Sequence, residues 1–320
     1  MKVVFLGTPD FAVLPLKKIA ASKHEVLAVV TQPDRPVGRK AVVTPCAVKV
    51  AAESLGLKTL GYEKIRKEGV EDLKALKPDV MVTCAYGQIL SQEILDIPKH
   101  GIINVHASLL PKYRGAAPIQ WSIINGDKVT GVTIMKTEAG VDTGDIIAVQ
   151  KTDITEAETA GELFDRLSAI GADLIVKVLD ELEAGTATFV KQNDAEATHV
   201  KMLKKEDGII NFSKNSISIY NLVRGLNPWP VAYAFLHNKM LKIYSARVRG
   251  DITPAGKTPG EVVFADVKNG LIVACGGGAL ELTEVQLEGG KRMSAHDFLV
   301  GNKIKVGDIL TGAGLAALDK

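Results

Sequence analysis

Residues 1–183 alternate short apolar runs with longer segments of helical period, and this alternation restricts the fold more than any other feature of the chain. A β-α order of this kind produces a parallel sheet covered by helices on both faces. The expected strands are residues 2–6, 26–30, 79–84, 101–105, 131–136 and 145–149, and the expected helices are residues 12–21, 45–55, 69–77, 117–124 and 159–183. We therefore predict an α/β first domain with a doubly wound, mostly parallel sheet.

The pattern changes after Gly185, which follows the last predicted helix as a C-cap. Residues 186–208 are polar and lack a sustained period, residues 216–226 are helical in pattern, and from Tyr233 onward short apolar runs are separated by Gly, Asn and Pro. Such spacing favours a small barrel, and the five-stranded barrel that binds oligonucleotides fits it. At 320 residues two domains are expected. We predict a catalytic domain at 1–189, a linker at 190–208 and a small OB-like β-barrel at 209–320.

Charge is divided unevenly between the two halves. Residues 1–190 carry 22 Lys and Arg against 24 Asp and Glu, whereas residues 191–320 carry 17 against 13. A basic second half suits a polyanionic partner, although an excess of this size is also found on ordinary solvated surfaces.

Other features argue against several classes of protein. The first turn, "GTPDFA" from Gly7 to Ala12, lacks the G-x-G-x-x-G pattern of a dinucleotide site, which argues against a nicotinamide enzyme. No apolar run approaches the roughly 20 residues of a membrane span, and the first residues are typical of a strand, not of a signal peptide. The three cysteines are odd in number and widely separated. They indicate a reducing cytoplasm and fit no zinc pattern.

Asn104 and His106 interrupt an apolar run at the end of a predicted strand. Side chains two residues apart on a strand point to the same face, so the amide and the imidazole project together. The carboxyl end of a strand is where open α/β sheets bind ligands. We therefore expect both side chains in the functional site.

Asp142 is the candidate acid, because Gly140 and Gly144 on either side of it allow a tight turn that presents the carboxylate. Asp145 is the competing candidate, but capping of the following strand explains it equally well. An Asn, a His and an Asp suit acyl transfer to an amine: the first two stabilise an oxyanion and the carboxylate orients or charges the imidazole. No residue has the sequence context of a covalent nucleophile with its own base.

Each of these residues also has a structural interpretation. A histidine at a strand end is often a core residue with its hydrogen bonds satisfied, and an aspartate in a glycine-flanked turn is often part of the turn alone. Arg114 and Gly115 can simply lead into the following helix. The combination of the three residues within some 40 positions favours the functional interpretation.

The chain resembles the methionyl-tRNA formyltransferase family over essentially its whole length. The motifs that carry the resemblance are "FLGTPDFA" at the start, "TQPDRPVGRK" at 31–40, "AYGQIL" at 85–90, "NVHASLLPKYRGAAPIQ" at 104–120, "GVTIM" at 131–135, "GVDTGD" at 140–145 and "NPWP" at 227–230. The H-x-S-L-L-P core is shared with formyltransferases that act on glycinamide ribonucleotide and on sugar nucleotides. The motifs around Arg39 and Arg114 are narrower and favour the tRNA enzymes.

The resemblance implies a role for each matching position. Asn104, His106 and Asp142 correspond to the catalytic residues. The segments 108–111 and 85–87 correspond to the folate pocket, which gives Ser108, Leu109, Leu110, Pro111, Ala85, Tyr86 and Gly87 as binding residues. The loop at 31–44 corresponds to the segment that enters the tRNA acceptor end, with Arg39 and Lys40 as contacts, and the barrel corresponds to a tRNA-holding domain.

The resemblance further implies 10-formyltetrahydrofolate as the co-substrate, charged initiator methionyl-tRNA as the acceptor, and no metal ion. We expect a cytoplasmic enzyme, a monomer without membrane contact. Two alternatives remain at this stage: a formyltransferase acting on an amino sugar nucleotide or another small amine, and a tRNA-binding module without catalysis. The chain also departs from the family pattern at Ala107, where many members have Gly, and in the less basic loop after Arg39.

Overall fold

The computed structural model describes residues 1–38, 41–302 and 304–312, which form two compact units. The first unit comprises Met1–Pro118, Val129–Asp153 and Phe164–Val200, and the second comprises Ile119–Lys128, Ile154–Leu163 and Lys201–Lys320. The two units therefore interleave along the sequence. The domain boundaries at residues 189 and 208 remain a prediction.

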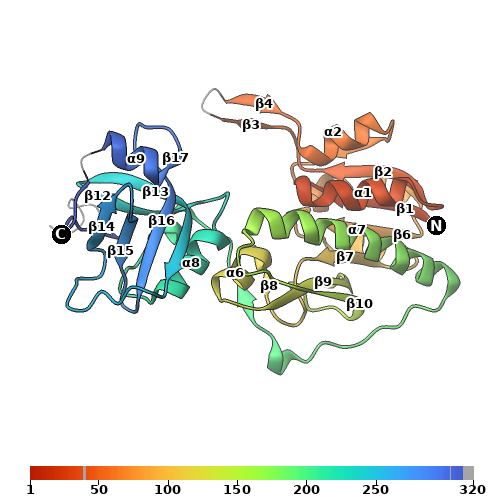
Figure 1. Cartoon of the computed structure of the whole chain (residues 1–320). Helices are drawn as coiled ribbons and strands as arrows, with labels where there is room; N and C mark the ends of the chain where they lie inside the picture. The colour runs from red at the N-terminus through yellow and green to blue at the C-terminus, as the bar shows by residue number, and fades with distance from the viewer. Residues whose placement is uncertain (39–40, 303, 313–320) are drawn as a thin grey trace. The chain divides into compact units, whose positions relative to one another are not determined.

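The first unit is built on a seven-stranded sheet (Figure 1). Its strands are β1 (Lys2–Gly7), β2 (Glu25–Thr31), β5 (Thr59–Gly61), β6 (Val80–Cys84), β7 (Ile102–His106), β9 (Val129–Lys136) and β10 (Ile146–Asp153). The spatial order is β10-β9-β7-β6-β1-β2-β5. The five strands from β7 to β5 run parallel, and β9 pairs antiparallel with both β7 and β10. The predicted doubly wound, mostly parallel sheet is confirmed.

Helices cover both faces of this sheet because successive side chains of the buried strands alternate between the faces. They are the 3₁₀ turn η1 (Asp10–Ala12) and the helices α1 (Val13–Ala20), α2 (Ala47–Ser54), α3 (Ile65–Glu68), α4 (Val70–Leu76), α5 (Gln92–Leu95) and α7 (Ala160–Ala184). On one face, Val4 and Leu6 of β1 share a buried cluster with residues of α3, α4 and α5. On the other face, α7 approaches closely at Gly171, where a Cβ would lie 2.9 Å from Val105 of β7.

Residues 31–44, which we expected to be a loop, contain a β-hairpin. Its strands are β3 (Arg35–Val37) and β4 (Val42–Thr44), paired antiparallel, and Figure 1 shows the hairpin extending away from α2. Val42 and Val43 of this hairpin are exposed. Two ion pairs fasten its base, Asp34 to Lys49 at 2.8 Å and Arg35 to Glu63 at 2.7 Å. The hairpin within this loop was not predicted, because two prolines and Gly38 are typical of a segment without strands, whereas β3 accommodates Pro36 in a two-stranded ribbon.

The second unit contains an antiparallel sheet in the order β12-β13-β16-β15-β14, with β17 paired to β16. The strands are β12 (Ala232–Leu236), β13 (Lys239–Arg249), β14 (Val262–Asp266), β15 (Gly270–Ala274), β16 (Ala279–Leu287) and β17 (Met293–Ser294). The two edges are joined through one segment, because Thr311 pairs with Phe235 of β12 and Ile309 pairs with Glu261 beside β14. The sheet therefore closes on itself as the small barrel that the spacing predicted.

The barrel core and its turns follow from local sequence. β12 and β13 are joined by His237 and Asn238, both with positive φ (45° and 64°), as a two-residue type I′ turn requires. Apolar residues of α8 (Ser216–Gly225) and α9 (Ala295–Gly301) share the buried cluster of the strands, with Ile219 and Phe298 at 1% exposure. The remaining short elements are α6 (Pro118–Ile124), η2 (Asp194–Glu196), η3 (Lys205–Gly208), β8 (Arg114–Gly115) and β11 (His199–Val200). No helix in the described part of the chain is long and apolar enough to cross a membrane.

Candidate active site

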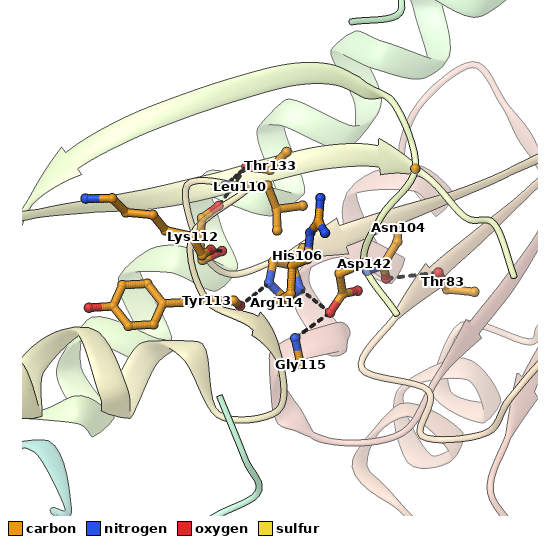
Figure 2. A network of polar contacts seen from close by, with 12 residues as sticks. Thr83, Asn104, His106, Leu110, Lys112, Tyr113, Arg114, Gly115, Thr133 and Asp142 are labelled. Atoms are coloured by element: carbon orange, nitrogen blue, oxygen red, sulfur yellow. Dashed lines mark hydrogen bonds and ion pairs between the residues drawn. The ribbon is translucent and has the colours of Figure 1, made fainter. Parts of the chain in front are cut away.

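Asn104 and His106 lie at the carboxyl end of β7, in the middle of the first unit's sheet. Their spacing of two residues places both side chains on one face of the strand, as the sequence predicted. His106 is buried, whereas Asn104 is partly accessible. Figure 2 shows both side chains, with that of Asp142, at this end of the strand.

The orientation of the Asn104 amide is fixed by Thr83 of the neighbouring strand β6. The two residues are register partners, and the Thr83 hydroxyl donates a hydrogen bond to Oδ1 of Asn104 at 2.9 Å (Figure 2). The amide nitrogen Nδ2 therefore points the other way, and it has no hydrogen-bond partner among the residues that the structure describes. It is an oriented donor that a ligand can use. Sequence analysis did not identify Thr83, because only the pairing of β6 with β7 brings it beside Asn104.

His106 is held by its other ring nitrogen. Nε2 lies 3.0 Å from the carbonyl oxygen of Tyr113. A carbonyl can only accept, so Nε2 carries the hydrogen and Nδ1 is the nitrogen that remains for chemistry. Nδ1 lies 3.7 Å from Oδ2 of Asp142, which is within ion-pair range but too long for a hydrogen bond.

The turn that carries Asp142 depends on close packing at two glycines. A Cβ at Gly144 would lie 1.9 Å from the carbonyl oxygen of Lys136, and one at Gly140 would lie 2.3 Å from Oγ1 of Thr143. Asp142 itself has a φ of 52°, in the left-handed region that a residue with a side chain rarely adopts. Gly140 and Gly144 therefore allow the predicted tight turn because neighbouring atoms lie too close for a side chain at either position. Neither glycine has a positive φ.

The Asp142 carboxylate has a second contact that aims it at the histidine. The backbone N–H of Gly115 donates to Oδ2 of Asp142 at 2.8 Å (Figure 2). Asp145, the competing candidate, precedes β10, and its carbonyl accepts from the N–H of Lys136 at 2.9 Å. The structure therefore places Asp142 beside His106.

A segment that we predicted to be a linker forms part of this site. Residues 190–200, here called the strap, pair with the first unit at both ends: Val190 with Ile146, and β11 with β8. Between these ends, Gln192 donates hydrogen bonds to the carbonyl oxygens of Asp142 (2.9 Å) and Gly144 (2.8 Å). The sequence offered no signal for Gln192, because an isolated glutamine in a polar segment has no diagnostic pattern.

The segment 108–111 has its polar groups largely engaged within the protein. The Ser108 hydroxyl donates to the carbonyl oxygen of Lys112 at 2.7 Å, and Thr133 of β9 donates to the carbonyl of Ser108 and accepts from the N–H of Leu110. Leu110 is buried, whereas Leu109 and Pro111 are partly accessible. Any ligand at this segment would therefore meet the backbone and apolar side chains, not the Ser108 hydroxyl.

The segment 85–87 follows β6 and presents mainly backbone. Ala85 and Gly87 are exposed and have positive φ (47° and 84°), whereas the Tyr86 side chain between them is 4% exposed and packs in the core. The carbonyl oxygen of Tyr86 accepts from the Thr8 hydroxyl at 3.0 Å. Burial raises the pKa of the Tyr86 phenol, so this group stays neutral. Tyr86 is thus a structural side chain within a backbone-lined loop.

Arg39 and Lys40, the predicted tRNA contacts, lie outside the described residues. Within the described residues, no group of three or more His, Cys, Asp and Glu side chains is placed to hold a metal ion. Cys84, at the end of β6, is fully buried, and burial raises the pKa of its thiol, so it is not an activated nucleophile.

The chemistry that the site supports is that of an oriented amide donor and an imidazole beside a carboxylate. Such groups stabilise an oxyanion that forms during acyl transfer.

Comparison with known families agrees with this chemistry. Residues 1–179 match the family described as formyl transferase, and residues 202–303 match the formyl transferase C-terminal domain. The chain is 50% identical over 314 residues to a methionyl-tRNA formyltransferase from Lachnospira eligens, covering 97% of this chain and 99% of the relative. It is 49% identical over 311 residues to a methionyl-tRNA formyltransferase from Geotalea uraniireducens, covering 97% and 98%.

Solved structures show the same fold at lower sequence identity. An N-formyltransferase from Helicobacter canadensis, in complex with folinic acid and dTDP-3-aminofucose, is 21% identical with a TM-score of 0.67, and the match covers 88% of this chain and 98% of that one. HypX from Aquifex aeolicus, in complex with tetrahydrofolic acid, is 14% identical with a TM-score of 0.62, covering 97% and 50%.

Proposed function

This chain belongs to the methionyl-tRNA formyltransferase family, and we propose that Asn104, His106 and Asp142 carry its reaction. The enzyme transfers the formyl group of 10-formyltetrahydrofolate to the α-amino group of methionyl-initiator tRNA. The observation that supports the three residues most strongly is the pairing of the buried His106 imidazole with the Asp142 carboxylate beside the oriented amide of Asn104.

In the proposed mechanism the methionyl amine attacks the formyl carbon. The adjacent ester makes this amine less basic than a lysine amine, so part of it is neutral near neutral pH. A bond forms between the amine nitrogen and the formyl carbon, and the formyl oxygen becomes an oxyanion. Nδ2 of Asn104 donates to this oxyanion, and so does Nδ1 of His106 when the imidazole is protonated.

Asp142 supports the reaction through charge and proton transfer. Nε2 of His106 is committed to Tyr113, so a second hydrogen at Nδ1 makes the ring cationic, and the carboxylate 3.7 Å away stabilises that cation. The attacking amine loses a proton, which passes through water to Asp142. The intermediate then collapses with cleavage of the bond between the formyl carbon and N10. Asp142 returns the proton through water to N10 as the reduced folate leaves, so the carboxylate is regenerated.

We propose the folate-binding residues from their exposure and from their position at the ends of the strands. The exposed backbone of Ala85 and Gly87 and the partly accessible Leu109 and Pro111 flank the carboxyl ends of β6 and β7. We assign the contacts to the backbone at Ser108, Leu110 and Tyr86, because the side chain of each is buried, and to the apolar surface at Leu109 and Pro111. This arrangement suits a planar heterocycle with donors and acceptors along its edge.

The second unit is proposed to supply affinity for tRNA. Residues 191–320 carry the basic excess of the chain, and a barrel of this type offers a surface for a polynucleotide. We also propose that the enzyme acts in the cytoplasm as a monomer. Binding of methionyl-tRNA to the full chain should weaken as salt rises, because phosphate contacts release counterions. A dissociation constant that does not change with salt would contradict this role.

A transfer assay with competing acceptors tests the proposed function. Radiolabelled 10-formyltetrahydrofolate is incubated with the enzyme and either charged initiator tRNA or a dTDP-linked amino sugar, the class of compound bound in the Helicobacter canadensis structure. We expect label in the methionyl-tRNA and none in the sugar. Labelling of the sugar alone would overturn the assignment in favour of a small-amine formyltransferase.

A further inference from the structure

We propose that Gln192 is a positioning residue that holds the Asp142 turn for catalysis, with Arg114 fixing the orientation of its amide. The proposal rests on the proposed role of Asp142 and extends it to the strap, which lies beyond the residues 1–179 matched by the catalytic-domain family. Gln192 is a positioning residue because its contacts are with the turn and not with the reacting atoms.

All four hydrogen-bonding positions of the Gln192 amide are used. Its oxygen accepts from Nε and Nη2 of Arg114 at 3.0 and 2.9 Å, and its nitrogen donates to the carbonyl oxygens of Asp142 and Gly144. A guanidinium can only donate and a carbonyl can only accept, so these partners allow a single orientation of the amide. Arg114 thus turns the NH2 group of Gln192 toward the turn.

The turn needs such support because its backbone is strained. Asp142 has a φ of 52°, in the left-handed region that a residue with a side chain rarely adopts. Gln192 donates to the carbonyls of Asp142 and Gly144, which belong to the first and third peptide groups after the strained residue. The Asp142 carboxylate is aimed at His106 only while this conformation holds.

The strap that carries Gln192 is hydrogen-bonded to the first unit on both sides of this residue. Val190 and Ile146 exchange two backbone hydrogen bonds at 2.8 and 2.9 Å, and the N–H of Arg114 donates to the carbonyl of Thr198 at 2.8 Å. Arg114 is 4% exposed, and its ion pair with Asp194 is the outer contact of the cluster, since Asp194 is mostly exposed. The strap therefore connects the loop that holds His106 through Tyr113 with the turn that holds Asp142.

The decisive variant is Gln192→Glu. It keeps an oxygen for Arg114 and nearly the same shape, but it loses both N–H donors and directs a carboxylate oxygen at two carbonyls. Gln150→Glu is the matched control, because Gln150 is exposed on β10 and its amide donates only to the carbonyl of Lys151 among the described contacts. Single-turnover formyl transfer to methionyl-tRNA, the KM for both substrates and the thermal midpoint are measured for each protein.

We expect Gln192→Glu to lower the single-turnover rate about ten- to hundredfold, with both KM values within about threefold of wild type, because misplacement of a catalytic group by about 1 Å costs on this scale. Gln150→Glu should keep the wild-type rate. The double variant Gln192→Glu with Asp142→Asn should be no slower than Asp142→Asn alone, because a turn without its carboxylate has nothing left to position.

Two outcomes separate the proposals. The role of Gln192 would be overturned, and that of Asp142 left intact, by a Gln192→Glu enzyme with the wild-type rate. The same conclusion would follow if the rate of the double variant fell by the product of the two single-variant reductions. An Asp142→Asn enzyme with the wild-type rate would overturn the proposed mechanism itself. If Gln192→Glu does not fold, Gln192→Met, which keeps the side-chain length without either polar group, replaces it in the same cycle and the same criteria apply.

Discussion

Nδ1 of His106 lies 3.7 Å from Oδ2 of Asp142, and the same carboxylate oxygen accepts the N–H of Gly115 at 2.8 Å. The carboxylate is therefore held by the backbone and leaves the imidazole a short distance away, without a direct hydrogen bond. This spacing permits a charge interaction with a protonated ring and leaves Nδ1 able to donate to a substrate oxygen.

Asp142→Asn should lower the single-turnover rate of formyl transfer on the order of 10²-fold. The asparagine keeps an oxygen for the Gly115 N–H and nearly the same shape, but it cannot stabilise an imidazolium or take up a proton. Folding should be unaffected, which circular dichroism checks. Asp145→Asn, three positions away and before β10, is the control, and it should stay within about threefold of wild type. Equal rates for the two variants would remove Asp142 from the mechanism.

Thr83→Val should reduce transfer about two- to tenfold without changing the KM of formylfolate. The variant removes the hydroxyl that donates to Asn104, so the amide loses its fixed orientation. One neutral hydrogen bond contributes about 0.5–1.5 kcal/mol, which sets the size of the effect. The same substitution at Thr130, a buried residue of β9 outside the site, is the control. A Thr83→Val enzyme with the wild-type rate would show that Asn104 does not need this contact.

Arg39→Ala should raise the KM for methionyl-tRNA and leave formylfolate binding unchanged. Arg39 belongs to the segment between β3 and β4, whose base is fastened by the ion pairs of Asp34 and Arg35. An anchored hairpin can present a basic group to a phosphate or a base edge. Trypsin should cut the free enzyme at Arg39 or Lys40, spare Arg35 because Pro36 follows it, and cut less when tRNA is bound. Equal cleavage with and without tRNA, with a fully active variant, would exclude the contact.

The free energy of unfolding should fall as pH drops below about 6.5, the ordinary pKa of histidine, in part because of His24. Burial, together with the positive charge of the Met1 ammonium, lowers the pKa of His24 in the folded protein, although Asp180 and Glu183 oppose the shift. The unfolded chain therefore binds a proton first, and stability is lost on acidification. His24→Gln should flatten this slope between pH 7.5 and 5.5 in urea titrations. His296→Gln, at an exposed histidine, is the control, and an unchanged slope in His24→Gln would contradict the assignment.

Much of the fold could be predicted because its signals are local. The strand that ends in Asn104 and His106 combines an apolar run with period two, and the long helix α7 carries a period of three to four residues that ends before Gly185. These patterns arise because one face of each strand or helix is buried. The spacing of apolar residues within the segment alone identifies that face. The type I′ turn at His237 and Asn238 carries no glycine, so its position was not evident from the sequence.

The site could be predicted only where residues are close in sequence or share a motif. Asn104, His106 and Asp142 were found in that way, and the structure places His106 and Asp142 together. Thr83 and Gln192 were not found from the sequence. Thr83 lies beside Asn104 only because of the register between β6 and β7, and Gln192 lies beside the Asp142 turn only because residues 190–200 return to pair with β8. Contacts of this kind depend on the packed fold, and a single sequence contains no periodic signal for them.

The most direct test of the central claim is the single-turnover rate of formyl transfer to methionyl-tRNA for His106→Ala and Asn104→Ala at saturating formylfolate. Loss of one oxyanion donor typically costs about 2.7–4 kcal/mol, so each variant should be slower by about 10²- to 10³-fold. The dissociation constant for methionyl-tRNA should stay close to that of wild type, because neither residue is proposed to hold the tRNA. Transfer by either variant within about threefold of the wild-type rate would contradict the assignment of these residues to the reaction.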